Sequence, residues 1–171
     1  IEDEGFEAVF IGSGAGLPKF MGIPGEQANG VFSANEYLTR NNLMKAFRED
    51  YDTPIAHGKK VAVVGGGNSA LEEALYLTKF AKKVYLIHRR NEFRADKIVQ
   101  ERVFNNDKIE VVLNSSPLEI YGNNTVEKLI LKDTQTSEVS EIIKEYDDTA
   151  ILAGEGPLMK DLVEISDHDF N

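Results

Sequence analysis

Three glycines and an alanine stand where an apolar run ends and a helix-forming run begins. Residues 60–64 are rich in β-branched side chains, and residues 70–74 are good helix formers. Between them lies the spacing Gly65-x-Gly67-x-x-Ala70. An order of strand, tight turn and helix is the context in which this spacing binds the pyrophosphate of a dinucleotide.

Each small residue of this turn has a physical role. Gly65 allows the sharp turn off the strand, and Gly67 has no Cβ, so a pyrophosphate can approach the backbone. Ala70 lets the helix pack close to the strand, and the start of the helix offers free N–H groups and a positive dipole end. The cofactor-binding residues predicted here are Gly65, Gly66, Gly67, Asn68, Ser69, Ala70 and Glu73.

A basic loop follows the second strand of this unit. Residues 68–80 carry apolar residues at helical spacing, and residues 83–88 read as a strand, which completes a βαβ unit. A ribose 2′-hydroxyl usually meets Asp or Glu at the end of that strand, whereas a 2′-phosphate calls for Arg. The loop instead supplies further predicted cofactor-binding residues, which are His88, Arg89, Arg90 and Arg94. NADPH is therefore favoured over NADH.

Either feature alone has a plainer interpretation. The glycines could form a structural turn of an α/β domain, and the arginines could lie in a solvated loop. The two features occur in the right order and at the right spacing, and this combination favours the nucleotide interpretation.

Composition limits the possible partners. The chain has 171 residues, 42% of them hydrophobic, and a net charge of −10, so we expect one main core and no binding to nucleic acid or an anionic membrane. It has no Cys, which excludes a thiolate metal site or a dithiol redox step within this chain. No apolar run is long enough to cross a membrane, so we expect a cytoplasmic protein. The chain begins at Ile1, as a fragment or processed chain would.

The elements around the nucleotide unit predict an α/β fold. We expect a Rossmann-like parallel sheet with helices on both faces and an antiparallel β meander on its edge. Residues 12–16 after the first strand form either a plain crossover or a second cofactor contact. The predicted strands are 6–11, 60–64, 83–88, 108–113, 118–121, 126–132, 141–146 and 149–154, and the predicted helices are 33–47, 68–80 and 94–105.

These residues resemble a known group of flavoproteins. Residues 61–74, 88–95 and 100–103 are similar to the NADPH domain of thioredoxin reductases, which implies that Arg89, Arg90 and Arg94 grip the 2′-phosphate. Residues 6–51 resemble flavoproteins related to the glutamate synthase small subunit. Both belong to one FAD/NAD(P) superfamily, in which an NADPH domain is inserted into an FAD domain.

The resemblance implies a division of labour. Residues 1–32 would be a crossover strand and connector from an FAD domain, 33–148 the NADPH-binding domain, and 149–171 a return strand and tail. The chain would present hydride to an FAD held by a domain absent from it and would be inactive alone. Thioredoxin reductases of this type carry a Cys-x-x-Cys in the NADPH domain, and this chain has none. The alternative is a non-catalytic NADP(H)-binding module, which the sequence does not separate from the first reading.

Overall fold

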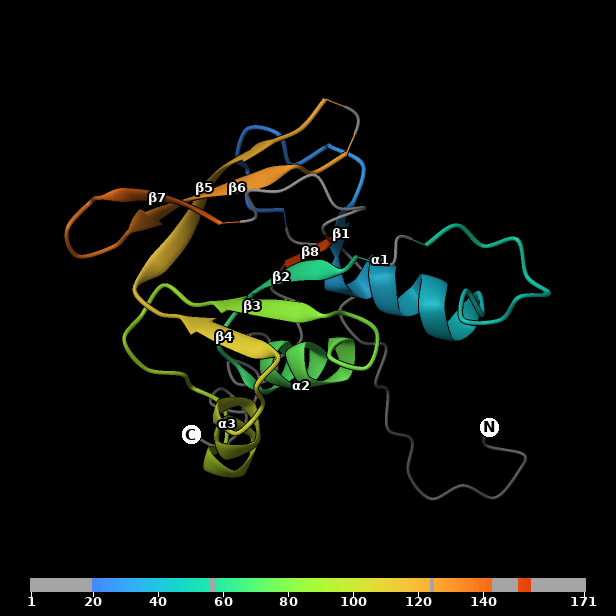
Figure 1. Ribbon diagram of the computed structural model, residues 1–171, viewed down its shortest axis with the longest axis horizontal. Coiled ribbons are helices and arrows are strands. Elements are labelled where there is room, and N and C mark those ends of the chain that lie inside the picture. Colours follow the sequence, from blue (N-terminus) through green and yellow to red (C-terminus); the bar gives the residue numbers. More distant parts are fainter. Residues whose placement is uncertain (1–19, 56–57, 124, 143–150, 155–171) are drawn as a thin grey trace, which may run out of the picture.

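Five parallel strands form the central sheet of the molecule (Figure 1). The computed structural model describes residues 20–55, 58–123, 125–142 and the backbone of 151–154. The strand order is β1-β8-β2-β3-β4, and every neighbouring pair is parallel. The strands are β1 (Val31–Ser33), β2 (Lys60–Val64), β3 (Lys83–Ile87), β4 (Ile109–Val112) and β8 (Ile151–Gly154).

Two helices cover one face of this sheet. These are α2 (Asn68–Leu77) and α3 (Lys97–Phe104), which lie below the sheet in Figure 1. Alternate strand residues point towards the helices, because successive side chains of a strand face opposite sides. The core of this layer includes the buried side chains of Val61, Val63, Leu71, Ala74, Leu77, Val84, Leu86, Val99 and Val103. The predicted packing face of residues 68–80 is thus confirmed.

A separate antiparallel sheet covers the other face. It consists of β5 (Ser115–Tyr121), β6 (Lys128–Asp133) and β7 (Val139–Ile142), in that order. A second apolar core lies between the two sheets and contains Ala62, Ile87, Ile120, Leu129 and Leu131. The α/β class, the parallel sheet and the antiparallel meander are therefore confirmed.

The position of the meander differs from the prediction. We expected it on the edge of the parallel sheet, but it forms a sheet of its own that packs across a face. Two features account for this position. Asn114 has a positive φ of 52°, which turns the chain out of β4. The Leu129 and Leu131 side chains of β6 are buried, as packing against a face of the central sheet allows. In the described part of the chain, this sheet takes the place of helices on that face.

The helix predicted over residues 33–47 begins as expected and ends early. Ser33 is its N-cap, and its hydroxyl oxygen accepts a hydrogen bond from Glu36 N at 3.2 Å. The α1 helix (Ala34–Leu38) continues as a π-helical turn, η2 (Thr39–Leu43). Lys45 then has a φ of 54°, which no α-helix can continue. Met44 and Phe47, the last apolar residues of the predicted helix, lie beyond its observed end, and both side chains are exposed.

Smaller corrections concern other elements. The helix predicted over 94–105 begins only at Lys97, and the apolar side chain of Ile98 on it is exposed. The edge strand β1 was not predicted. The strand expected at 6–11 and the glycines of 12–16 lie outside the described residues, as do 143–146 and 149–150 of two predicted strands. No helix within the described ranges has the length and apolar character to cross a bilayer.

Candidate dinucleotide site

The glycine turn joins the central strand to the start of α2. Gly65 N donates to Ile87 O at 3.0 Å, which holds the turn against the end of β3. Gly67 is the N-cap of α2 and has no side chain to cap the helix. The first N–H groups of α2 therefore lack the side-chain acceptor that a Ser or Asp would supply, and an anionic ligand could take its place.

Gly66 and Gly67 are required for different reasons. A Cβ on Gly66 would stand 2.2 Å from Cε1 of His88, so the protein itself excludes a side chain there. A Cβ on Gly67 would meet no atom within 4 Å. The space in front of Gly67 is therefore open, as the approach of a pyrophosphate requires.

His88 supports the turn from within the protein. Its side chain is only 3% exposed and packs beside Phe93, with the ring centroids 5.4 Å apart. Phe93 is also buried, and it anchors the loop that carries the arginines. The structure thus places His88 next to Gly66, as a buried wall of the site rather than an exposed ligand group.

Two contacts tie the arginine loop to the glycine turn. Arg94 N donates to Gly66 O at 2.8 Å. Asn68, the first residue of α2, and Asp96, the N-cap of α3, exchange two hydrogen bonds of 2.8 and 2.7 Å. The structure therefore brings together the two motifs that the sequence separates by about twenty residues.

The backbone of the loop is also held from the antiparallel sheet. Thr134 Oγ1 lies 3.0 Å from Arg89 O, and Asn114 N donates to Arg90 O at 3.1 Å. Ser115 N donates to His88 O at 3.0 Å. Residues of the β4–β5 and β6–β7 connections thus fix the start of the basic loop.

The three guanidinium groups face solvent. Arg89, Arg90 and Arg94 are all exposed. Among the residues that the structure describes, none of the three forms an ion pair with an acid, although the chain as a whole carries a charge of −10. Three unneutralised cations beside a helix N-terminus suit a ligand with more than one phosphate.

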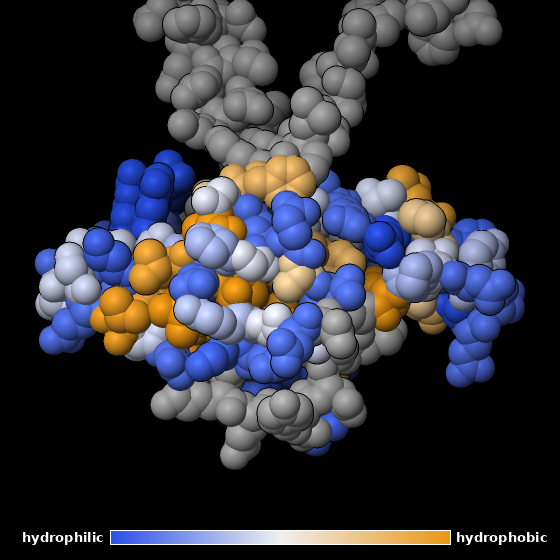
Figure 2. Space-filling model, turned by 90° about the horizontal axis from the view of Figure 1, so that it is seen from above, coloured by the Kyte–Doolittle hydropathy of each residue, from blue (hydrophilic) through white to orange (hydrophobic). Residues whose placement is uncertain are grey.

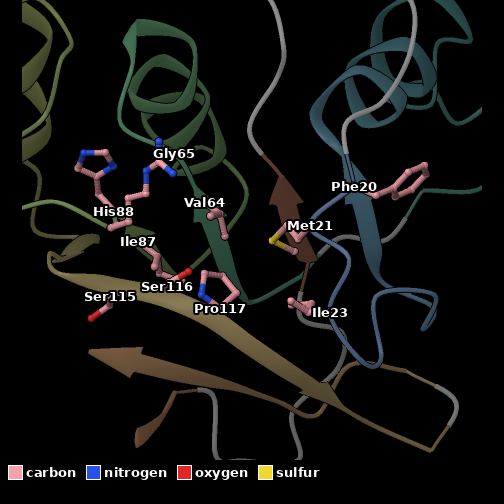
Figure 3. Close-up of a pocket in the computed structure, with 11 residues that line it drawn as sticks. Phe20, Met21, Ile23, Val64, Gly65, Ile87, His88, Ser115, Ser116 and Pro117 are labelled. Atoms are coloured by element: carbon pink, nitrogen blue, oxygen red, sulfur yellow. The ribbon is translucent and has the colours of Figure 1, made fainter. Parts of the chain in front are cut away.

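A pocket of about 240 Å³ opens beside the turn (Figure 3). Gly65, His88 and Arg89 form part of its wall. Figure 3 shows Met21 and Ile23 approaching from one side and Ser116 and Pro117 from β5. Sequence reasoning missed both of these walls. Residues 20–25 read only as a turn-rich connector, and no short-range pattern links them to residues 115–117.

Comparison with known proteins identifies the family. A family model described as pyridine nucleotide-disulphide oxidoreductase matches residues 2–157. The chain belongs to this family. The family's description names a pyridine nucleotide, the class of coenzyme to which the predicted NADPH belongs.

The chain is similar to several thioredoxin reductases. The protein from Peptoclostridium litorale is 37% identical over 142 residues, covering 83% of this chain and 41% of that relative. The protein from Mycolicibacterium smegmatis is 36% identical over 166 residues, covering 95% of this chain and 49% of that relative. The solved thioredoxin reductase from Streptococcus pyogenes superposes with a TM-score of 0.63 at 32% identity, covering 85% of this chain and 45% of that one.

These matches confirm the resemblance to the thioredoxin reductase-like FAD/NAD(P) flavoproteins. The likeness of residues 6–51 to the glutamate synthase small subunit stays a prediction. The chain spans less than half the length of the relatives named above. The description of its family includes disulphides, and this chain has no cysteine.

Glu73 and Ser69, also predicted to contact the coenzyme, lie on α2. Burial raises the pKa of the half-buried Glu73 carboxyl to about 7. Glu73 shares a helix face with Tyr76, whose hydroxyl accepts a hydrogen bond from Asn41 Nδ2 at 3.1 Å. In the described part of the chain, the Glu73 side chain has no hydrogen bond or ion pair with the arginine loop.

Proposed function

We propose that this chain is the NADPH-binding domain of a flavin-dependent oxidoreductase, which presents hydride to an FAD held outside it. The observation that carries the proposal is the hydrogen bond of 2.8 Å from Arg94 N to Gly66 O. It joins a glycine turn with open space for a pyrophosphate to a loop with three exposed guanidinium groups. A coenzyme with both a pyrophosphate and a 2′-phosphate matches this pair of features.

The residues have separate tasks in this scheme. The N–H groups at the start of α2 would bind the pyrophosphate, and Arg89, Arg90 and Arg94 would bind the 2′-phosphate. The pocket beside Gly65 offers apolar walls to a ring of the nucleotide. When bound, the nicotinamide and the flavin supply the hydride chemistry. The chain itself would bind the coenzyme and orient it.

The described site contains no obvious catalytic group. His88 is buried against Gly66 and Phe93, and the chain has no Cys. This composition suits a domain that holds a coenzyme, and it also suits the second candidate, an NADP(H)-binding module without turnover. An absorbance spectrum of the purified chain, combined with NADPH oxidation by an artificial acceptor, separates the two. Flavin absorbance with turnover would establish an enzyme, whereas nucleotide binding without either would favour the module.

Titration with 2′,5′-ADP, NADPH and NADH tests the coenzyme. We expect NADPH and 2′,5′-ADP to bind, and NADH to bind more weakly. Arg89→Ala combined with Arg90→Ala should lower the NADPH:NADH affinity ratio by at least about tenfold, because charge-assisted bonds to the 2′-phosphate are lost. Arg102→Ala, on the exposed surface of α3, is the matched control. A chain that binds neither 2′,5′-ADP nor NADPH would overturn the proposal.

The remaining expectations concern the surface of the chain, its binding partners and its location. Figure 2 looks onto the side of the antiparallel sheet and shows hydrophobic residues interspersed with hydrophilic ones. With a net charge of −10, the chain is proposed to bind neither nucleic acid nor an anionic membrane. Its partners would be NADP(H) and a flavin domain, and its location cytoplasmic.

A further inference from the structure

The antiparallel sheet reaches the arginine loop through one threonine. Thr134 stands at the turn between β6 and β7, and its Oγ1 lies 3.0 Å from Arg89 O and 3.1 Å from Asn114 O. A hydroxyl has one proton, so Thr134 shares it between these two carbonyl oxygens. Asn114 in turn donates its N–H to Arg90 O at 3.1 Å. Hydrogen bonds therefore hold the main chain of both consecutive arginines.

The turn that presents Thr134 is well ordered by its own hydrogen bonds. Asp133 Oδ1 accepts bonds of 2.7 Å from Gln135 N and Thr136 N, and Ser137 N donates to Asp133 O at 3.0 Å. The bonds from Thr136 N and Gln135 N hold the pKa of the Asp133 carboxyl below its usual value. None of them uses the Thr134 hydroxyl. The hairpin can therefore close without the hydroxyl, whose bonds go to Asn114 and to the arginine loop.

The arginine side chains have no comparable support. Within the described ranges, the guanidinium groups of Arg89 and Arg90 form no hydrogen bond or ion pair, and both side chains are exposed. A long side chain in solvent samples many rotamers, so its direction depends on how firmly its backbone is held. The bonds from Thr134 and Asn114 fix the main chain at Arg89 and Arg90, and so the point from which each side chain extends.

We propose that Thr134 and Asn114 are positioning residues that set the selectivity for a 2′-phosphate by holding the backbone of Arg89 and Arg90. The inference rests on the proposed function. It gives the antiparallel sheet a role in coenzyme choice. The opposite end of the loop has its own anchors, Arg94 N to Gly66 O and Asn68 to Asp96, so each end is fixed separately.

The test compares three ligands across matched variants of the chain. Thr134→Val removes the hydroxyl at nearly constant volume, and Thr134→Ser keeps it. Thr136→Val removes the hydroxyl of a neighbouring threonine, which accepts a hydrogen bond from Glu138 N. We expect Thr134→Val to weaken the binding of 2′,5′-ADP and NADPH by about three- to tenfold, which is the effect of one lost hydrogen bond. The affinity for NADH should stay unchanged within about twofold. Thr134→Ser and Thr136→Val should bind like the unmodified chain.

A double-mutant cycle distinguishes positioning from a general structural effect. If Thr134 acts through Arg89 and Arg90, Thr134→Val should cause no further loss of 2′,5′-ADP affinity in a background that carries both Arg89→Ala and Arg90→Ala. Additive losses, or an equal loss for all three ligands, would overturn the inference. If Thr134→Val does not fold, Thr134→Ala replaces it, because it also removes the hydroxyl, and it should weaken the binding of only those ligands that carry a 2′-phosphate.

The two proposals fail in different ways. An unmodified chain that binds neither 2′,5′-ADP nor NADPH overturns the proposed function, and this inference with it. An unmodified chain that binds both, while Thr134→Val leaves the NADPH:NADH ratio unchanged, overturns the positioning role alone.

Discussion

Asn68 and Asp96 hold the starts of two helices together through a reciprocal pair of hydrogen bonds. Asn68 Nδ2 donates to Asp96 Oδ2 at 2.8 Å, and Asp96 N donates to Asn68 Oδ1 at 2.7 Å. Asp96 is the N-cap of α3, yet its side chain does not cap its own helix. It serves the contact with α2 instead. The pair therefore links the glycine turn to the far end of the arginine loop.

Removing this pair should affect both stability and binding. Asn68→Ala deletes two hydrogen bonds, one of them to a carboxylate, and we expect the free energy of unfolding to fall by about 1–2 kcal/mol. NADPH affinity should fall as well, because Arg94 loses a fixed neighbour. Urea unfolding and NADPH titration measure the two effects. Asn91→Ala, an exposed change within the same loop, should alter neither. Equal behaviour of the two variants would contradict the link.

The adjacent glycines offer a contrast between folding and binding. Gly66→Ala puts a Cβ into the buried ring of His88, and we expect a loss of stability of about 2 kcal/mol or more. Gly67→Ala puts a Cβ into open space at a φ of −94°, so its stability should change by less than about 1 kcal/mol. NADPH affinity should nevertheless fall at least about tenfold in Gly67→Ala, since the methyl group occupies the approach of the pyrophosphate.

Thermal unfolding and nucleotide titration of both variants check this contrast. A Gly67→Ala chain that binds NADPH as the unmodified chain does would refute the assignment of the open space to a ligand. A fully stable Gly66→Ala chain would instead show that His88 can move aside.

Local sequence patterns predicted the strands and the helix around the glycine turn well. The glycine turn, α2 and β3 follow from propensity and hydrophobic periodicity within residues 60–88, because their packing partners lie close in sequence. The contact between Thr134 and Arg89 spans 45 residues, and no periodic pattern signals it. The same holds for residues 20–23 of the pocket wall. Long-range contacts of the connectors are what the sequence could not show.

The early end of η2 was missed for a related reason. Apolar residues at Met44 and Phe47 continue a helical spacing, and periodicity alone extends the helix to them. The positive φ of Lys45 ends it, and Thr53 Oγ1 donates to Met44 O at 2.7 Å, which satisfies a terminal carbonyl from a distant loop. A lysine at position 45 does not predict a positive φ.

The β6–β7 turn contains a residue in the left-handed region. Ser137 has a φ of 64° and is exposed. Because a Cβ is disfavoured there and glycine is not, Ser137→Gly should raise the free energy of unfolding by about 0.5–1 kcal/mol. Ser140→Gly, within β7, is the control and should lower it. Chemical unfolding of both variants measures the difference, and a destabilised Ser137→Gly chain would show that strain at this position is negligible.

The carboxyl of Glu73 makes stability depend on pH in a defined direction. Burial raises its pKa from 4.5 to about 7. Between these two values the unfolded chain releases the proton and the folded chain retains it, so ionisation favours unfolding as the pH rises. The stabilising effect of the protonated group is complete below about pH 4.5 and is lost as the pH passes 7.

Glu73→Gln should remove this dependence. A shift of this size corresponds to about 3 kcal/mol if fully retained, and solvent near a half-buried side chain reduces it to about 1–2 kcal/mol. We therefore expect the variant to be more stable than the unmodified chain by that amount at pH 8 and equally stable at pH 4. Urea unfolding across this range gives the difference curve. Glu72→Gln changes the exposed neighbour, and its difference in free energy of unfolding from the unmodified chain should not vary with pH. A flat difference for Glu73→Gln as well would mean that Glu73 is ionised at neutral pH.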